Sequence, residues 1–347
     1  MKLSVCMIVK DEEKNLSSCL DCVKNFADEI IIVDTGSKDK TKQIAKRYTD
    51  KVYDFKWCDD FSMARNYSFS LATKDYIMWL DADDFIPQKE QEKIKTLMQE
   101  LDTTKFDCIM CYYVASIKNP QFLYYRERIV KNHFGFIWRE PVHEAITPFG
   151  DIKYCNIKIY HNKVQIKNPK RNLKIYQKLL KNKVPLSPRG LYYYARELFY
   201  NGYYKKAITY FNKFLKSDGW VENKIDACIV KAECYLKLNR ENDAFSTLLS
   251  SFSYAKPRAK ICCMLANFFV KNNDFKTAKF WFKQALGNKE NNGGFIEVDF
   301  YTFIPSINLC MCCYRLGEFK ASKHYHILAK IYKPNANEVL YNDQFFK

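Results

Sequence analysis

Three carboxylates follow directly on an apolar segment, and their types and spacing suit metal binding. The segment YIMWL, at 76–80, precedes Asp81, Ala82, Asp83 and Asp84. Acids clustered at the end of a buried strand repel one another unless a cation or hydrogen-bond donors compensate. Mg²⁺ and Mn²⁺ take oxygen ligands and bridge them to substrate phosphates, so this turn suits a nucleoside diphosphate. Taken alone, the turn fits a helix cap equally well.

Two further residues have side chains suited to such a site. Arg65 offers an always charged, planar fork for a phosphate or a base edge. An ion pair with Asp59 or Asp60 is the alternative role for it. His161 closes the apolar segment 157–161, where a histidine serves either as a metal ligand or as a structural residue.

The elements that must position these residues follow an α/β pattern up to about residue 110. Apolar, β-branched runs predict strands, and the amphipathic stretches between them predict helices: strands at 3–9, 29–33, 51–53 and 76–80, helices at 12–25, 40–48 and 62–72. This alternation indicates a mostly parallel sheet covered on both faces, with the ligand site at the strand ends. Aromatic-rich strands at 108–114, 122–130 and 152–160 predict an antiparallel extension.

The second half of the chain repeats a pair of helices. Segments 193–215, 228–252, 261–286 and 308–331 each contain a helix, a short polar turn and a second helix. A small residue stands near the start of each second helix, where two helices must cross closely: Ala207, Ala244, Ala278 and Ser322. The pattern resembles tetratricopeptide repeats, whose period is about 34 residues. An ordinary helical bundle is the alternative.

Composition narrows the classes of function. The 347 residues are 48% hydrophobic and 16% aromatic, which excludes general disorder and supplies enough apolar material for two cores. No apolar run reaches the ~20 residues of a bilayer span, and the start reads as a strand, so a cytoplasmic protein is expected. The 14 cysteines are scattered along apolar segments and are expected to be free thiols. A net charge of +17 favours anionic partners.

Five motifs in a fixed order resemble glycosyltransferase family 2. They are LSVCMIVKDEEKN from Leu3, EIIIVDTGSKDKT from Glu29, Ala64-Arg65-Asn66, the Asp81–Asp84 turn, and Val142-His143-Glu144. The resemblance implies a GT-A domain over 1–165, an α/β fold with a mixed, mostly parallel sheet. A basic connector to about 190 and an all-α repeat domain over 191–347 are expected to follow.

The same resemblance implies a donor site for a nucleotide sugar. Its residues would be Val9, Glu12, Asp34, Gly36, Arg65, Asp81, Ala82, Asp83 and Arg128. Asp34 would accept a hydrogen bond from uracil or ribose beside the tight turn at Gly36. Glu12 would touch the nucleoside, with a solvated helix start as the alternative. Asp83 would be the principal metal ligand and His161 a further one.

The implied reaction is metal-dependent, inverting sugar transfer from a UDP-sugar, with Mg²⁺ or Mn²⁺ as cofactor. Glu144 would be the general base, and His143 would position the diphosphate or the acceptor. Repeats behind such a domain resemble sublancin-type peptide glycosyltransferases, which implies a Cys or Ser side chain of a peptide as acceptor. A homodimer is left open.

Two other functions remain open on the sequence. One is transfer to a cell-surface glycan or a lipid-linked sugar, with the basic stretch 151–190 against an anionic membrane. The other is a non-catalytic repeat scaffold, against which the intact acidic motif speaks. Nucleic acid is not expected as a partner, because no recognised motif accompanies the basic stretch.

Overall fold

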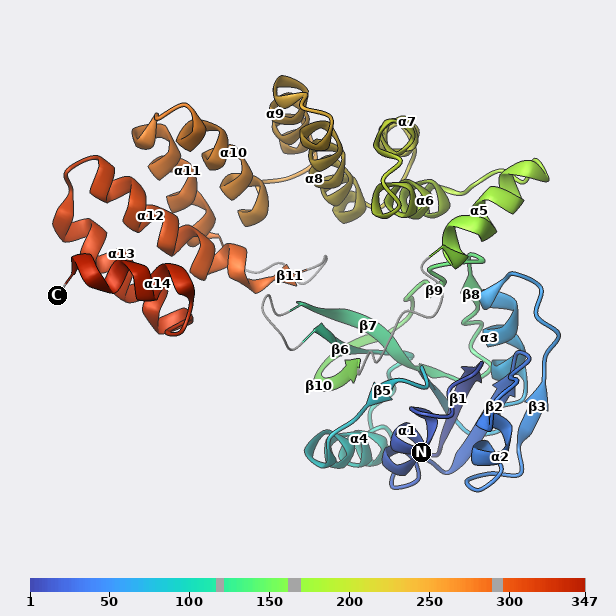
Figure 1. Cartoon of the computed structure of the whole chain (residues 1–347). Helices are drawn as coiled ribbons and strands as arrows, with labels where there is room; N and C mark the ends of the chain where they lie inside the picture. The colour runs from blue at the N-terminus through green and yellow to red at the C-terminus, as the bar shows by residue number, and fades with distance from the viewer. Residues whose placement is uncertain (117–121, 162–169, 289–295, 347) are drawn as a thin grey trace. The chain divides into compact units, whose positions relative to one another are not determined.

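The computed structural model of the chain describes residues 1–116, 122–161, 170–288 and 296–346 and divides into two compact units (Figure 1). The first unit contains residues 1–116 and 123–185, and the second is built mainly from residues 186–347. Within the described ranges, none of the helices is both long enough and apolar enough to span a bilayer.

A mixed sheet forms the first unit, with the strand order β3-β2-β1-β4-β7-β6-β10-β5. The strands are β1 (Leu3–Val9), β2 (Glu29–Asp34), β3 (Val52–Asp54), β4 (Tyr76–Leu80), β5 (Asp84–Phe85), β6 (Cys108–Ser116), β7 (Phe122–Lys131) and β10 (Ile152–His161). β1 is parallel to β2 and β4, and β2 is parallel to β3. The predicted mostly parallel sheet is therefore confirmed, and the first four strands end at one edge.

The extension of the sheet differs in part from the prediction. β7 runs antiparallel to β4, and β5 antiparallel to β10, but β10 runs parallel to β6. Between β6 and β10 the chain passes through β7 and a small hairpin of β8 (Trp138–Arg139) and β9 (Ala145–Ile146), and then returns in the direction of β6. The predicted antiparallel extension is therefore correct for β7 and β5 and wrong for β10, which is parallel to β6.

Helices cover both faces of this sheet. They are α1 (Leu16–Val23), α2 (Thr41–Ala45), α3 (Phe61–Ser70) and α4 (Gln88–Glu100). α5 (Arg171–Lys181) follows the sheet in sequence. Alternate residues of β1 point to opposite faces. Val5 packs in the core shared with α1, α2 and α4, whereas Cys6 packs in the core that contains Phe69 of α3. α3 is thus the helix of the face on which Trp79 and Trp138 are also buried.

The second unit consists of helix pairs, as predicted (Figure 1). They are α6 (Pro188–Tyr200) with α7 (Tyr204–Leu215), α8 (Val221–Lys237) with α9 (Glu241–Ser250), α10 (Ala259–Lys271) with α11 (Phe275–Gly287), and α12 (Phe303–Arg315) with α13 (Phe319–Tyr332), followed by α14 (Asn337–Asn342). The small residues expected at the helix crossings, Ala207, Ala244, Ala278 and Ser322, are fully buried.

Each pair turns through a residue with positive φ: Gly202, Asn239, Asn273 and Gly317. The next backbone N–H then bonds back into the first helix, as from Tyr203 to the Leu198 carbonyl (2.8 Å) and from Glu318 to the Cys313 carbonyl (2.9 Å). Glycine and asparagine tolerate this conformation best, so these turns set where each helix ends.

A buried carboxylate fastens the opposite, amino edge of the sheet. Glu29, at the start of β2, pairs with Lys51 and accepts hydrogen bonds from the Ser4 hydroxyl and from the Thr73 backbone N–H (2.9 Å) and hydroxyl (2.8 Å). Burial alone would raise its pKa, but these partners lower the pKa of Glu29 from 4.5 to about 2. The carboxylate therefore links β1, β2 and the segment that leads into β4.

Glu29→Gln is expected to lower the free energy of unfolding near pH 7 by about 2 kcal/mol, because an amide cannot replace the ionised acceptor. Because the pKa of Glu29 is lowered on folding to about 2, its contribution is complete above its ordinary pKa and is lost as the pH falls through the folded value. Urea unfolding near pH 7 and near pH 3 measures both effects. Asp54→Asn, which breaks an exposed pair with Lys42, is the control; an equal loss for Glu29→Gln at both pH values contradicts the assignment.

Candidate active site

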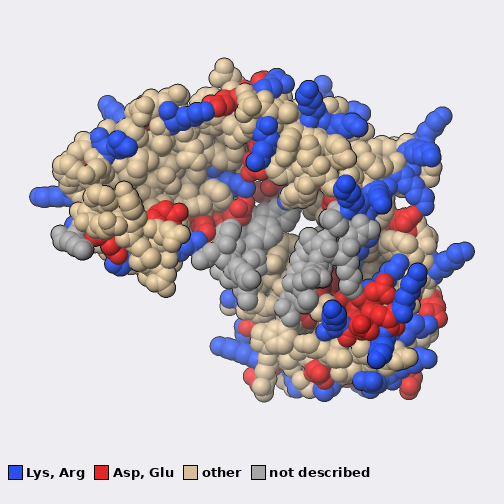
Figure 2. Space-filling view, viewed as in Figure 1, with Lys and Arg blue, Asp and Glu red and all other residues tan. Residues whose placement is uncertain are grey.

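The acidic turn lies where β4 ends, at the carboxyl edge of the sheet. Figure 2 shows acidic side chains gathered over the tip of β1, with lysine and arginine side chains around them. Asp84 is fully buried, whereas the side chains of Asp81 and Asp83 are 34% and 27% exposed. An Asp84 oxygen accepts a hydrogen bond from the Asp81 backbone N–H (3.0 Å), which closes the turn. The side chains of Asp81 and Asp83 therefore keep contact with solvent, while the buried Asp84 holds the backbone of the turn at Asp81.

Arg128, on β7, lies beneath the turn and is fully buried. Its guanidinium donates to an Asp84 oxygen (2.9 Å) and to the Trp79 carbonyl (3.1 Å), and it stacks on the Trp79 ring at 3.7 Å. Burial raises the pKa of Asp84, as do the neighbouring acids, and the Arg128 charge opposes them. The structure thus places Arg128, predicted as a donor-site residue, as the buried counter-ion of Asp84.

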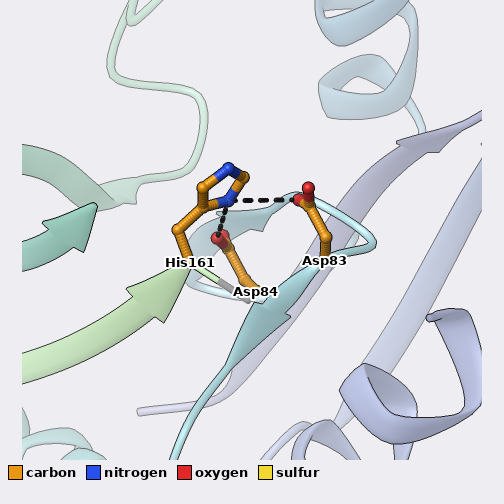
Figure 3. Close-up of side chains that lie close together, drawn as sticks. All are labelled: Asp83, Asp84 and His161. Atoms are coloured by element: carbon orange, nitrogen blue, oxygen red, sulfur yellow. Dashed lines mark ion pairs between the residues drawn. The ribbon is translucent and has the colours of Figure 1, made fainter. Parts of the chain in front are cut away.

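Asp83, Asp84 and His161 form the one group of possible metal ligands within the described residues, with one ligand atom of each lying within 4.8 Å of the others. Figure 3 shows the His161 ring, from the end of β10, facing both carboxylates. Its Nδ1 is 3.4 Å from an Asp83 oxygen and 4.0 Å from an Asp84 oxygen. Burial opposes charge on the ring, but the carboxylates raise the pKa of His161. The position attracts positive charge, whether a proton or a metal ion.

One oxygen of this group is buried without a hydrogen-bond partner. Asp84 Oδ2 accepts hydrogen bonds from Arg128 and from the Asp81 N–H. Asp84 Oδ1 is buried and has no hydrogen bond. A buried acceptor without a donor is costly unless something binds it. Two carboxylates supply the oxygen ligands that Mg²⁺ and Mn²⁺ prefer, and the imidazole adds a nitrogen ligand of the kind that transition ions accept, so these residues fit a divalent ion.

Asp34 ends β2 at the same edge and has a similarly incomplete set of partners. It is 1% exposed, and its Oδ1 accepts the backbone N–H groups of Gly36 and Ser37, both at 2.8 Å. Its Oδ2 is buried without a hydrogen bond. Gly36 has a φ of +103°, which only glycine adopts without strain. The predicted tight turn at Gly36 is present, and it satisfies only one of the two Asp34 oxygens.

The residues after β1 are bound to the loop after β2. The Glu12 backbone N–H donates to the Thr41 hydroxyl (2.7 Å), and the Glu12 side chain accepts from Asn15 (2.8 Å) at the start of α1. Val9 is buried, and its carbonyl accepts from Thr35. The contacts of Glu12 are therefore those of a residue at a helix start, which was the alternative to a nucleoside contact. Val9 binds the residue that follows Asp34.

Arg65, on α3, bridges two acids of the site. Its Nε donates to Glu144 (2.6 Å) and its Nη2 to Asp81 (2.7 Å). The guanidinium stacks against Trp79 at 4.9 Å and Trp138 at 4.7 Å. Burial would raise the pKa of Asp81, but Arg65 and Arg128 hold it well below its usual range. Neither Asp59 nor Asp60 is the partner of Arg65: Asp59 pairs with Lys178, and Asp60 caps α3.

The structure brings together most of the predicted site residues, including Ala82, which is buried within the acidic turn. Glu144 lies in the loop between β8 and β9 with His143, whose φ is +55°. Through Arg65, Glu144 is linked to Asp81, so the expected base and the acidic turn belong to one cluster of charges.

A known family matches the part of the chain that contains this site. The family described as "Glycosyl transferase family 2" matches residues 4–199, more than half of the chain. The chain belongs to glycosyl transferase family 2. A tetratricopeptide repeat matches residues 259–292. The family resemblance and the helix-pair repeats predicted from the sequence are thereby confirmed.

The SPbeta prophage-derived glycosyltransferase SunS of Bacillus subtilis (strain 168) is 30% identical to this family 2 chain over 259 residues, which is 70% of this chain and 60% of SunS. A TPR repeat-containing protein of Synechococcus elongatus is 34% identical over 146 residues, 42% of this chain and 35% of that protein. The chain thus spans about three fifths of the length of SunS. Among solved structures, S. aureus TarS 1–349 in complex with UDP is 14% identical with a TM-score of 0.39, and the match covers 73% of this chain and 91% of that one.

The structure adds residues to the family 2 site that the sequence did not reveal. Trp79 is a buried centre on which Arg65, Arg126 and Arg128 all stack. Trp138 covers the second face of Arg65. Trp79 stood in the apolar segment 76–80, but as an apolar residue of a strand it gave no sign of its arginine partners.

Arg128→Met is expected to reduce the free energy of unfolding by about 3 to 5 kcal/mol, because it leaves the Asp84 carboxylate buried without its cation. Adding Asp84→Asn to this variant should recover part of the loss, because the uncompensated charge is then removed. Urea unfolding measures both variants. Lys153→Met is the control, because it breaks a pair with Glu100, whose side chain is 51% exposed; an equal loss for both single variants would show that burial of the pair is not the cause.

Proposed function

We propose that this chain is an inverting, metal-dependent glycosyltransferase that moves a hexose from a UDP-sugar to a Cys or Ser side chain of a peptide. The observation that carries the proposal is the arrangement at the carboxyl edge of the sheet. There, Asp34 lies at the end of β2 and the acidic turn follows β4, Arg65 links the turn to Glu144, and both Asp34 and Asp84 keep one buried oxygen without a partner.

The donor is proposed to bind along the ends of β1, β2 and β4. Asp34 Oδ2 would accept the N–H of uracil or a ribose hydroxyl, and Gly36 would allow the nucleoside to approach the backbone; the unpartnered Oδ2 and the positive φ of Gly36 support this. Asp83, Asp84 and His161 would hold Mg²⁺ or Mn²⁺, which when bound neutralises charge on the diphosphate. Asp81, paired with Arg65, would meet the ribose or a metal-bound water.

A cation for the diphosphate is also needed from the chain itself, and Arg126 is the arginine proposed for this role. Arg65 binds two carboxylates, and Arg128 is fully buried. Arg126 pairs with its neighbour Glu127 (3.1 Å) but lies over Trp79 at 4.8 Å, keeps 21% of its side chain exposed, and contributes to lowering the pKa of Asp81. Its charge therefore reaches the acidic turn from the solvent side.

In the proposed step, the acceptor oxygen or sulfur attacks the anomeric carbon as the bond from that carbon to the diphosphate oxygen breaks. UDP leaves with the bonding electron pair, and Glu144 takes the acceptor proton. One in-line displacement inverts the anomeric carbon and needs no covalent sugar intermediate. His143, next to Glu144, would orient the acceptor or the diphosphate.

The peptide acceptor is supported by similarity to SunS and by the tetratricopeptide match. Stacked helix pairs provide extended surfaces for peptides. Because nucleotide sugars are made in the cytoplasm, we propose that the transfer takes place there.

The acceptor is tested by incubating the purified protein with nucleotide sugars and with small peptides encoded beside its gene, read by intact mass. A hexose-sized increase on a Cys or Ser supports the proposal, whereas transfer to carbohydrate alone contradicts it.

Asp83→Asn is expected to reduce Mn²⁺-dependent release of UDP from UDP-glucose by about 100-fold or more, because it removes an outward-facing ligand and charge. Chelation of the metal should reduce the wild-type rate to the same level. UDP release measures the rate, and calorimetry with UDP and Mn²⁺ measures binding. Asp75→Asn, at the far end of β4, is the matched control and should keep the wild-type rate. Full activity of Asp83→Asn would contradict the metal site.

A further inference from the structure

The loop that carries Glu144 is attached to α3 at several points. It joins the two short strands of the β8–β9 hairpin, in which Trp138 pairs with Ile146 and Arg139 with Ala145. Two of its residues, Glu140 and His143, have positive φ values of 78° and 55°. Non-glycine residues in this conformation persist only where the surroundings hold them. The contacts of α3 show what holds this loop.

Asn66 fixes the base of the hairpin. Its side-chain amide donates to the Trp138 carbonyl (2.9 Å), and its side-chain oxygen accepts from the Trp138 backbone N–H (2.8 Å). The amide thus pairs with Trp138 as a neighbouring strand would, with both hydrogen bonds made to one residue. A bidentate contact of this kind fixes both the position and the orientation of the segment it holds.

The tip of the hairpin is held from the same helix. The Phe61 backbone N–H, at the start of α3, donates to the Pro141 carbonyl (2.9 Å), and Arg65 donates to the Glu144 side chain (2.6 Å). The Trp138 ring in turn covers the Arg65 guanidinium. From the other side, the buried Tyr176 of α5 donates to the Val142 carbonyl (3.3 Å).

We propose that Asn66 is a positioning residue for the general base: through the Trp138 backbone, it sets where Arg65 holds Glu144. This inference rests on the proposed function, since it assigns Asn66 to a step in which Glu144 takes the acceptor proton. Asn66 touches neither the acidic ligand group nor Asp34, so its contribution falls on the chemical step and not on donor binding. A displacement of the base by about 1 Å is enough to slow such a step severely.

Asn66→Ala tests this inference through hydrolysis of UDP-glucose, in which water takes the place of the acceptor. The kcat is expected to fall about tenfold or more, with the KM for UDP-glucose and the Kd for UDP changed less than about twofold. Asn132→Ala is the matched control, because Asn132 also binds backbone through its amide, donating to the carbonyls of Ala72 (3.0 Å) and Lys74 (2.9 Å). It is expected to lower the melting temperature comparably while the kcat stays at the wild-type value.

Arg65→Lys provides a second test that does not depend on Asn66→Ala folding well. Lysine keeps the charge but lacks the fork that joins Asp81 and Glu144, so the kcat is expected to fall. An equal kcat for Asn66→Ala and Asn132→Ala overturns the inference, and so does weakened UDP binding in Asn66→Ala. Glu144→Gln tests the base itself. If this variant retains the wild-type kcat, Glu144 is not the general base, and the positioning role of Asn66 is contradicted as well. A wild-type protein that turns over no nucleotide sugar contradicts the proposed function itself.

Discussion

The site depends on keeping several carboxylates close together at the edge of a buried sheet. Asp81, Asp84 and Glu144 would repel one another there without compensation. Two buried guanidinium groups supply it, Arg128 from below and Arg65 from the side. Both stack on Trp79, so one indole ring on β4 orients the cations that stabilise the acids following its own strand. Asp83, which neither arginine holds in the described contacts, is left facing outward with His161.

The sheet order explains why residues far apart in sequence meet here. β4 lies between β1 and β7, so the acidic turn is adjacent both to the end of β1 and to the strand that carries Arg128. β10 brings His161 beside the turn through its pairing with β5. The long-range order of the strands, more than any local motif, therefore determines which side chains share the site.

Much of this arrangement follows from the sequence, because strands and the residues after them are local features. The acidic turn after residues 76–80, the turn at Gly36 and the helix pairs with their small crossing residues were all predictable. The roles of Arg65 and Arg128 were not, because their partners lie 16 to 79 residues away and every partner is simply an acid in sequence. α4 escaped prediction because its sequence is mostly polar, with Ile94, Leu97 and Met98 alone marking its buried face.

The motif Ala64-Arg65-Asn66 shows how three adjacent residues serve three different purposes. Successive residues of a helix point about 100° apart, so neighbours in sequence reach different surroundings. Ala64 is fully buried where α3 meets the sheet, Arg65 reaches the acids, and Asn66 reaches the backbone of Trp138. A larger residue at Ala64 would push α3 outward and move both of its neighbours together. The small residue thus sets the distance, and the two polar residues depend on that distance to hold the loop of Glu144.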